Sequence, residues 1–214
     1  MVAMADQPPR SVKIGADERT GWSSERPRRD GGPPRPVDVS VKSRVLRPSD
    51  RMRYSPGSLV VVVGAGASKP DEFAARVVEE RGVVLSLAKV RELLAGRAAE
   101  DEIEARSREV LDAAVAKRLD AGQSVVLAVP GFDAGERERY VRLAHARRRP
   151  RHLVLIETSR DHVQEEERAP LDALRRALDA GELGAEGFQT VLRLSGNALT
   201  ELKRIVFAAP PRED

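Results

Sequence analysis

Five short apolar runs, each followed by a segment with helical periodicity, constrain the fold of this chain more than any other feature. The runs are rich in Val, Leu and Ile and cover residues 59–63, 83–87, 124–129, 152–157 and 190–194. Near-continuous apolar strands that alternate with helices are typical of a parallel sheet covered on both faces. Right-handed crossovers then predict a three-layer, doubly wound α/β fold with five parallel strands. Any ligand crevice in such a fold lies at the carboxyl ends of the strands.

The helices between and after these strands are predicted from apolar spacing and from glycine and proline stops. They cover about residues 70–80, 89–94, 101–121, 133–149, 160–180 and 197–206. This order places four groups of residues at the predicted crevice, namely Gly64–Ser68, Ala88–Arg91, Pro130–Gly131 and Glu157.

The chain divides by composition into an arm, a domain and a tail. Residues 1–57 are rich in Pro, Arg and Gly and hold 12 Lys/Arg against 7 Asp/Glu, a net charge of +5 within a chain of net charge +3. They show no apolar periodicity, so a disordered basic arm is predicted, although residues 44–54 are mixed enough to pack along the domain edge. Residues 58–208 form the α/β domain, and residues 209–214 form a tail.

Several classes of site are excluded by residue content. The chain has no cysteine, so it has no disulfide, thiolate metal site or cysteine nucleophile. Its three histidines, His145, His152 and His162, show no metal-ligand spacing, and no metal site is expected. No apolar run approaches the ~18 residues that span a bilayer, so we expect a cytoplasmic protein without membrane contact.

The segment after the first strand is the main candidate binding site. Strand, glycine turn and helix start follow one another here, which is the arrangement that cradles phosphates. The candidate nucleotide-binding residues are Gly64, Gly66, Ser68 and Lys69. However, Asp71 and Glu72 fall in the first helical turn, where their charge opposes a phosphate, and Ser68 with Asp71 is interpreted as an N-cap pair. The loop is therefore predicted to have the backbone of a phosphate-binding turn, with the anion position occupied by its own side chains.

Three segments carry a resemblance to a known family. Residues 59–73, Val84-Leu-Ser-Leu-Ala-Lys-Val-Arg91 and Val125-Val-Leu-Ala-Val-Pro130 resemble the P-loop kinases, which are ATP-binding, AAA-like P-loop proteins. The likeness is greatest to polynucleotide-kinase-like domains, as in bacterial polynucleotide kinase-phosphatase. It covers about residues 58–206 and implies the α/β fold already described.

The resemblance also shows where the chain departs from active kinases. Their first turn reads G-x-x-x-x-G-K-[ST]. Counted from Gly64 without a gap, Lys69 stands on the second glycine and Pro70 on the lysine, whereas a one-residue deletion puts Lys69 on the lysine and Pro70 on the magnesium-binding hydroxyl. Ala88 stands in place of the general base, whereas Arg91 keeps the position of an acceptor-side arginine. The polar motif after the third strand is replaced by residues 127–130, and the lid is shortened near residues 167–170. The resemblance therefore implies a pseudoenzyme with no catalytic residue, with ATP and Mg²⁺ disfavoured.

The favoured hypothesis is a degenerate, non-catalytic regulatory or interaction protein with an unknown protein partner. One alternative is an ATP-binding kinase or NTPase with an unorthodox loop and Lys69 on phosphate. A second alternative is a nucleic-acid-associated protein, although a solvated tail and helix end would explain the same residues. Its basic residues would be Arg26, Arg28 and Arg29 in the arm and Arg147, Arg148, Arg149 and Arg151 in the domain. Glu157 is either a Walker-B-like carboxylate or, as favoured, a hydrogen-bonded residue at a strand end.

Overall fold

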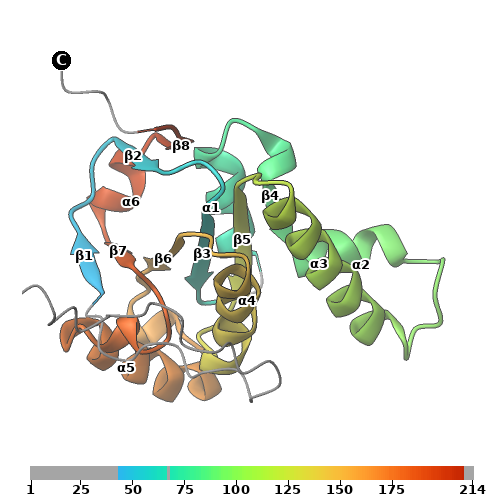
Figure 1. Cartoon of the computed structure of the whole chain (residues 1–214). Helices are drawn as coiled ribbons and strands as arrows, with labels where there is room; N and C mark the ends of the chain where they lie inside the picture. The colour runs from blue at the N-terminus through green and yellow to red at the C-terminus, as the bar shows by residue number, and fades with distance from the viewer. Residues whose placement is uncertain (1–42, 67, 210–214) are drawn as a thin grey trace, which may run out of the picture. The chain divides into compact units, whose positions relative to one another are not determined.

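A parallel sheet of six strands forms the centre of the domain in the computed structural model, which describes residues 43–66 and 68–209 (Figure 1). The strand order is β1-β7-β6-β3-β5-β4, and every pairing is parallel. The strands are β1 Arg44–Leu46, β3 Leu59–Gly64, β4 Val84–Ser86, β5 Val125–Pro130, β6 Arg151–Ile156 and β7 Thr190–Leu194. The doubly wound α/β prediction is confirmed, and β1 adds one strand to the five expected.

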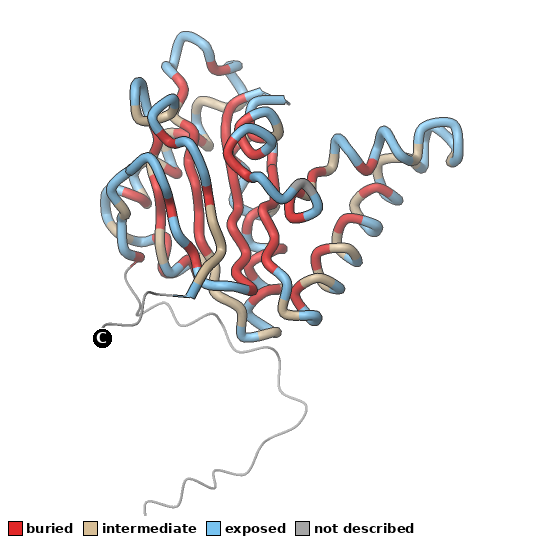
Figure 2. The backbone as a smooth tube through the Cα atoms, turned by 90° about the horizontal axis from the view of Figure 1, so that it is seen from above, coloured by how far each residue is buried: buried red, intermediate tan, exposed pale blue. Residues whose placement is uncertain are grey.

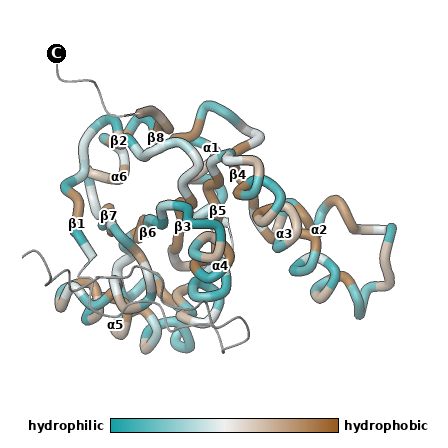
Figure 3. Tube along the Cα trace, in the orientation of Figure 1, coloured by the Kyte–Doolittle hydropathy of each residue, from teal (hydrophilic) through white to brown (hydrophobic). Residues whose placement is uncertain are grey.

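Helices cover both faces of this sheet, and a hydrophobic cluster lies under each cover. In the first cluster, α3 (Ile103–Asp120), α4 (Ala134–Ala146) and α5 (Glu165–Asp179) pack against one face of the sheet. The second packs α1 (Lys69–Val77), α6 (Asn197–Glu201) and a two-stranded parallel sheet on the other. The helix α2 (Leu87–Leu94) lies beside α3 (Figure 1). Along α4 and α5, hydrophilic and hydrophobic residues alternate (Figure 3). Three short 3₁₀ turns complete the elements: Arg81–Val83, Arg160–His162 and Glu182–Gly184.

The central strand β3 explains why its sequence is apolar at every position. Leu59, Val61 and Val63 belong to the first cluster, whereas Val60 and Val62 belong to the second. All five are fully buried. Figure 2 draws the strands at the centre of the sheet as buried. A strand with both faces covered has no position for a polar side chain, and β-branched residues pack well on its pleated surface.

The predicted last helix over residues 197–206 is wrong in its second half. The helix α6 ends at Glu201, and Arg204–Phe207 form a strand, β8, which pairs in parallel with β2, Arg51–Tyr54. Met52 and its register partner Ile205 are both buried in the second cluster. Burial through a partner far away in the chain therefore overrides a local helical pattern of fewer than three turns.

The structure describes only residues 43–57 of the predicted arm. These residues contribute β1, at the edge of the main sheet, and β2, so the expected packing of residues 44–54 along the domain edge is found. Residues 1–42, which include Arg26, Arg28 and Arg29, lie outside the described residues, as does most of the tail. The division into arm, domain and tail stays a prediction. Across residues 43–66 and 68–209, no helix combines the length and apolar character needed to cross a membrane.

Candidate functional site

The loop after β3 lies at the carboxyl edge of the sheet, where the crevice was predicted. A Cβ on Gly64 would stand 3.2 Å from the Cβ of Ile156 on the neighbouring strand, so only glycine fits there without a shift. Gly64 also accepts a hydrogen bond of 2.9 Å from the N–H of Gly131, which follows β5. Gly66 has a φ of 76°, in the left-handed region that favours glycine, and it is exposed. The turn is thus held between the ends of β5 and β6.

The first turn of α1 is acidic, and its predicted cap is wrong. Ser68 is the N-cap residue, but its φ and ψ of −101° and −25° are helical, and its side chain makes no capping hydrogen bond. Lys69 begins the helix and is exposed, whereas Pro70 is buried. One carboxylate oxygen of Asp71 is buried with no hydrogen-bond partner among the described residues. The helix start therefore presents uncapped backbone together with two carboxylates, those of Asp71 and Glu72.

A third carboxylate approaches this loop from α5. The Glu167 carboxylate lies close to Gly131, because a Cβ built on that glycine would stand 3.4 Å from its Oε1 atom. The apolar side chains of Phe132 and Val163, 3% and 4% exposed, belong to the same packed cluster as Ala65. The carboxyl edge of β3 and β5 is thus covered by apolar side chains and bordered by negative charge.

The acceptor-side candidate Arg91 is already engaged. Its Nε donates a hydrogen bond of 2.6 Å to Glu104 on α3, and its terminal nitrogen forms an ion pair with the same carboxylate. The hydrogen bond from Arg91 is the main reason that the pKa of Glu104 lies below its ordinary value. Both side chains are about half exposed. Arg91 therefore lies on the surface of the α2–α3 pair rather than projecting unpaired towards the loop.

Glu157, at the end of β6, is a hydrogen-bonded residue, as favoured from the sequence. Its side chain is 8% exposed, and it accepts hydrogen bonds from Arg175 at 2.5 and 3.2 Å. Arg193 on β7 approaches its other oxygen to 2.7 Å. Arg175 also donates to the carbonyl of Thr158. Two guanidinium groups thus satisfy this carboxylate and tie α5 to the sheet.

A groove beside Lys69 was not foreseen from the sequence. It has a volume of about 330 Å³ and lies between α1, the end of β6 and α6. Lys69, Glu72, Phe73, Arg76, Ile156 and Leu199 line it. Arg76 lies over the Phe73 ring at 5.4 Å and donates hydrogen bonds to the carbonyls of Leu199 and Leu202. No sequence signal could have found this groove, because α1 and α6 meet only in the folded chain.

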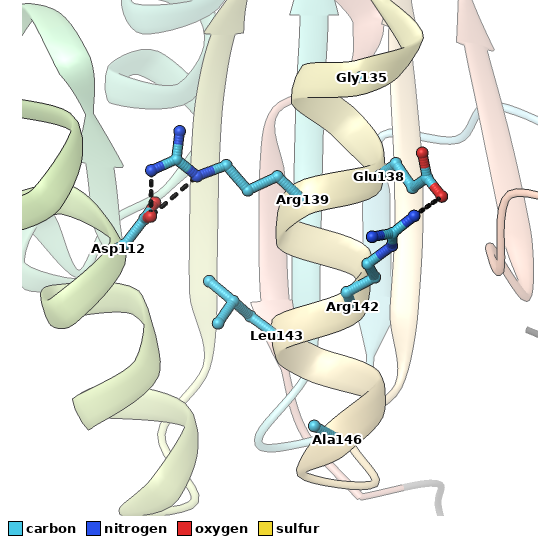
Figure 4. A pocket seen from close by; sticks show the side chains of 7 residues that line it. All are labelled: Asp112, Gly135, Glu138, Arg139, Arg142, Leu143 and Ala146. Carbon is cyan, nitrogen blue, oxygen red and sulfur yellow. Dashed lines mark hydrogen bonds and ion pairs between the residues drawn. The ribbon is translucent and has the colours of Figure 1, made fainter. Parts of the chain in front are cut away.

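A second groove, of about 370 Å³, lies between α3 and α4 (Figure 4). Arg139 points from α4 to Asp112 on α3 and forms an ion pair with it, and Arg142 pairs with Glu138 at 2.5 Å within α4. The open groove continues past Leu143 to Ala146. Its charged groups are therefore paired with one another.

The basic run after α4 is largely structural. Arg147 donates to Asp120 at 2.7 Å, and Arg149 donates to the carbonyl of Leu119 at 2.9 Å. Arg151 donates to the carbonyl of Gly187 at 2.7 Å, and burial lowers the pKa of its guanidinium. Arg148, with a φ of 56°, is exposed. Three of the four domain arginines proposed for nucleic-acid contact thus stabilise the fold.

The three histidines lie apart from one another in the fold. His152 is buried on β6, its Nδ1 lies 2.7 Å from the Thr190 hydroxyl, and its ring lies 4.6 Å from that of Tyr54. His145 and His162 lie elsewhere and are exposed. Within residues 43–66 and 68–209, no three His, Asp or Glu side chains are arranged to hold a metal ion.

The sheet order, the glycine turn after its central strand and the helix that follows define an α/β protein of the P-loop kinase type. A family model described as an AAA domain matches residues 59–182, and the chain belongs to this family. The predicted membership of the P-loop kinase superfamily is therefore confirmed.

Two solved structures are among those similar to this chain. One is described as a "putative kinase" from Chloroflexus aurantiacus, with 16% identity and a TM-score of 0.41, covering 64% of this chain and 84% of that one. The other is the tunicamycin resistance protein of Deinococcus radiodurans, with 14% identity and a TM-score of 0.38, covering 67% of this chain and 91% of that one. No curated protein matches the sequence.

Proposed function

We propose that this chain is a non-catalytic domain of the P-loop kinase type that acts as a regulatory or interaction protein, through binding rather than by turnover. The first turn of α1 carries the proposal, because Lys69 is followed there by Pro70, Asp71 and Glu72. A magnesium triphosphate requires backbone N–H groups and a hydroxyl ligand for the metal at this position. Pro70 offers neither group, and the two carboxylates repel the phosphates.

The surrounding groups support the same conclusion. Phosphoryl transfer depends on cations and a metal that neutralise charge on the transferred group. Arg91 is paired with Glu104, and Glu157 is held by Arg175 and Arg193. The residues present therefore do not fit a magnesium triphosphate.

The test is a measurement of Mg²⁺-dependent ATP and GTP turnover by the full chain, with and without single-stranded oligonucleotide as acceptor. We expect no turnover above that of buffer. The Lys69→Ala variant distinguishes turnover by a contaminating enzyme, which the substitution leaves unchanged, from turnover by the chain itself. Turnover that disappears in this variant would refute the proposal.

A second candidate function is nucleotide binding without transfer, and the groove beside Lys69 favours it. The groove joins an apolar wall of Phe73, Ile156 and Leu199 to an exposed lysine, which can hold a phosphate as a point charge. Glu72 and Arg76 also line it, and they carry opposite charges. Calorimetry with AMP, ADP and ATP at about millimolar concentration tests this function. Binding that Lys69→Ala weakens supports the candidate, and Arg142→Ala, in the α3–α4 groove, is the control. Absence of heat with all three nucleotides removes it.

A further inference from the structure

The outer face of the two-stranded sheet formed by β2 and β8 carries an arginine cluster. Arg51 and Arg204 are register partners, and Arg53 follows Arg51 on the same face. All three side chains are exposed, whereas the alternate residues Met52, Tyr54 and Ile205 are buried. The alternation of a strand thus directs the three guanidinium groups to one side of the pair formed by β2 and β8. Figure 1 shows the place of these two strands.

This arrangement works against the stability of the sheet. Register partners on neighbouring strands lie about 4.8 Å apart, and like charges placed directly opposite destabilise a pair of strands. Arg204 has one ion pair, at 3.6 Å to Glu79, and the Glu79 side chain is 78% exposed. Among the described residues, the side chains of Arg51 and Arg53 form no ion pair or hydrogen bond. Among the described residues, only the ion pair with Glu79 offsets this repulsion.

We propose that this arginine face binds the phosphate backbone of a nucleic acid strand without reading its sequence. Guanidinium groups match phosphate oxygens in a bidentate manner, and neighbours on one strand face recur about every 6.7 Å, so the face offers several phosphate contacts in a row. Among the residues of β2 and β8 on this face, Val206 is the only apolar one, and it is half-buried; none of the aromatic rings in residues 43–66 and 68–209 is exposed and so free to stack on bases. The face thus lacks the apolar centre that a stable protein interface requires.

The experiment uses fluorescence anisotropy of a labelled, mixed-sequence DNA strand of about 20 nucleotides with the full chain. The Arg51→Gln/Arg204→Gln variant should bind about tenfold more weakly near 50 mM salt. Its plot of log K against log salt should flatten by about 1.4, because two phosphate contacts on a single strand are lost. The control is Arg97→Gln/Arg106→Gln, which removes the same net charge from exposed residues of the 95–102 loop and α3.

The control pair should leave both the affinity and the salt slope within twofold of the wild-type values. Equal weakening by both pairs would overturn the proposal, because net charge alone would then explain the binding. Displacement of the DNA by polyglutamate at the same charge concentration as unlabelled DNA would also overturn it, since the partner would then be an acidic protein. Thermal unfolding supplies the folding check: the Arg51/Arg204 variant should melt at or above the wild-type temperature, because a repulsion is removed.

Discussion

The buried histidine on β6 makes a quantitative prediction about stability at acid pH. His152 is 8% exposed, and its Nε2 has no hydrogen-bond partner among the described residues. Burial, with smaller contributions from Arg151 and Arg44, lowers its pKa to about 4. The unfolded chain keeps the ordinary value near 6.5, so it binds more protons than the folded chain between these two values. Stability should therefore be retained above pH ~6.5 and lost progressively as the pH falls towards about 4.

The magnitude follows from the two pKa values. Between about pH 7.5 and about pH 5, the difference in proton binding at this one residue amounts to about 2 kcal/mol of unfolding free energy. Urea unfolding at both pH values measures the loss in the wild-type chain and in the His152→Gln variant. The substitution shifts stability at every pH, because it removes the contacts with Tyr54 and Thr190, but the loss on acidification should shrink by about 2 kcal/mol.

The control for this prediction is His145→Gln, which alters an exposed histidine on α4 and should leave the wild-type loss unchanged. If His152→Gln loses as much stability on acidification as the wild type, the assigned cause is wrong. The residual loss common to all variants belongs to carboxylates, which begin to bind protons near the lower end of this range.

Three further substitutions test the packing and the polar contacts by chemical unfolding. Phe188→Ala removes a ring that is 1% exposed and should cost about 3–5 kcal/mol, and a cost under ~1 kcal/mol would contradict its place in the core. Arg137→Met should cost about 2–3 kcal/mol, because Glu186 and a backbone carbonyl lose a buried donor, and adding Glu186→Leu should recover part of that loss. Gly64→Ala brings a methyl group to 3.2 Å from Ile156 and should lower the free energy of unfolding by about 1–3 kcal/mol. An unchanged free energy of unfolding would show that Ile156 on β6 can shift at little cost.

The sequence predicted the elements whose signal is contained in their own residues. The five apolar runs became β3 to β7, because a strand buried on both faces must be apolar throughout. The strands β1, β2 and β8 were missed as strands, since each has only three or four residues and its pairing partner lies more than a hundred residues away along the chain. Such strands are defined by the contact itself and not by a local pattern.

The position of the loop after β3 was predicted correctly, whereas some of its contacts were not. Its place at the carboxyl edge of the sheet followed from topology, and the paired state of Glu157 was expected. The cap by Ser68 failed because the side chain can bond the helix start only from an extended backbone, and Ser68 is already helical. The basic run from Arg147 to Arg151 suggested a surface patch, but its partners come from α3 and from the loop before β7. Residue spacing within the run carries no information about those partners.

The glycines of the loop after β3 show why its sequence resembles a phosphate site more than its contacts do. Gly64 is required by the approach of Ile156, and Gly66 is favoured by a positive φ in the turn towards α1. Both requirements arise from joining a buried strand to a helix at the end of a parallel sheet, and neither involves a ligand. The residues that would distinguish a phosphate site are those that follow, and there the chain has Pro70, Asp71 and Glu72. The glycines are therefore evidence for the fold, whereas evidence about phosphate binding must come from the residues at the start of α1.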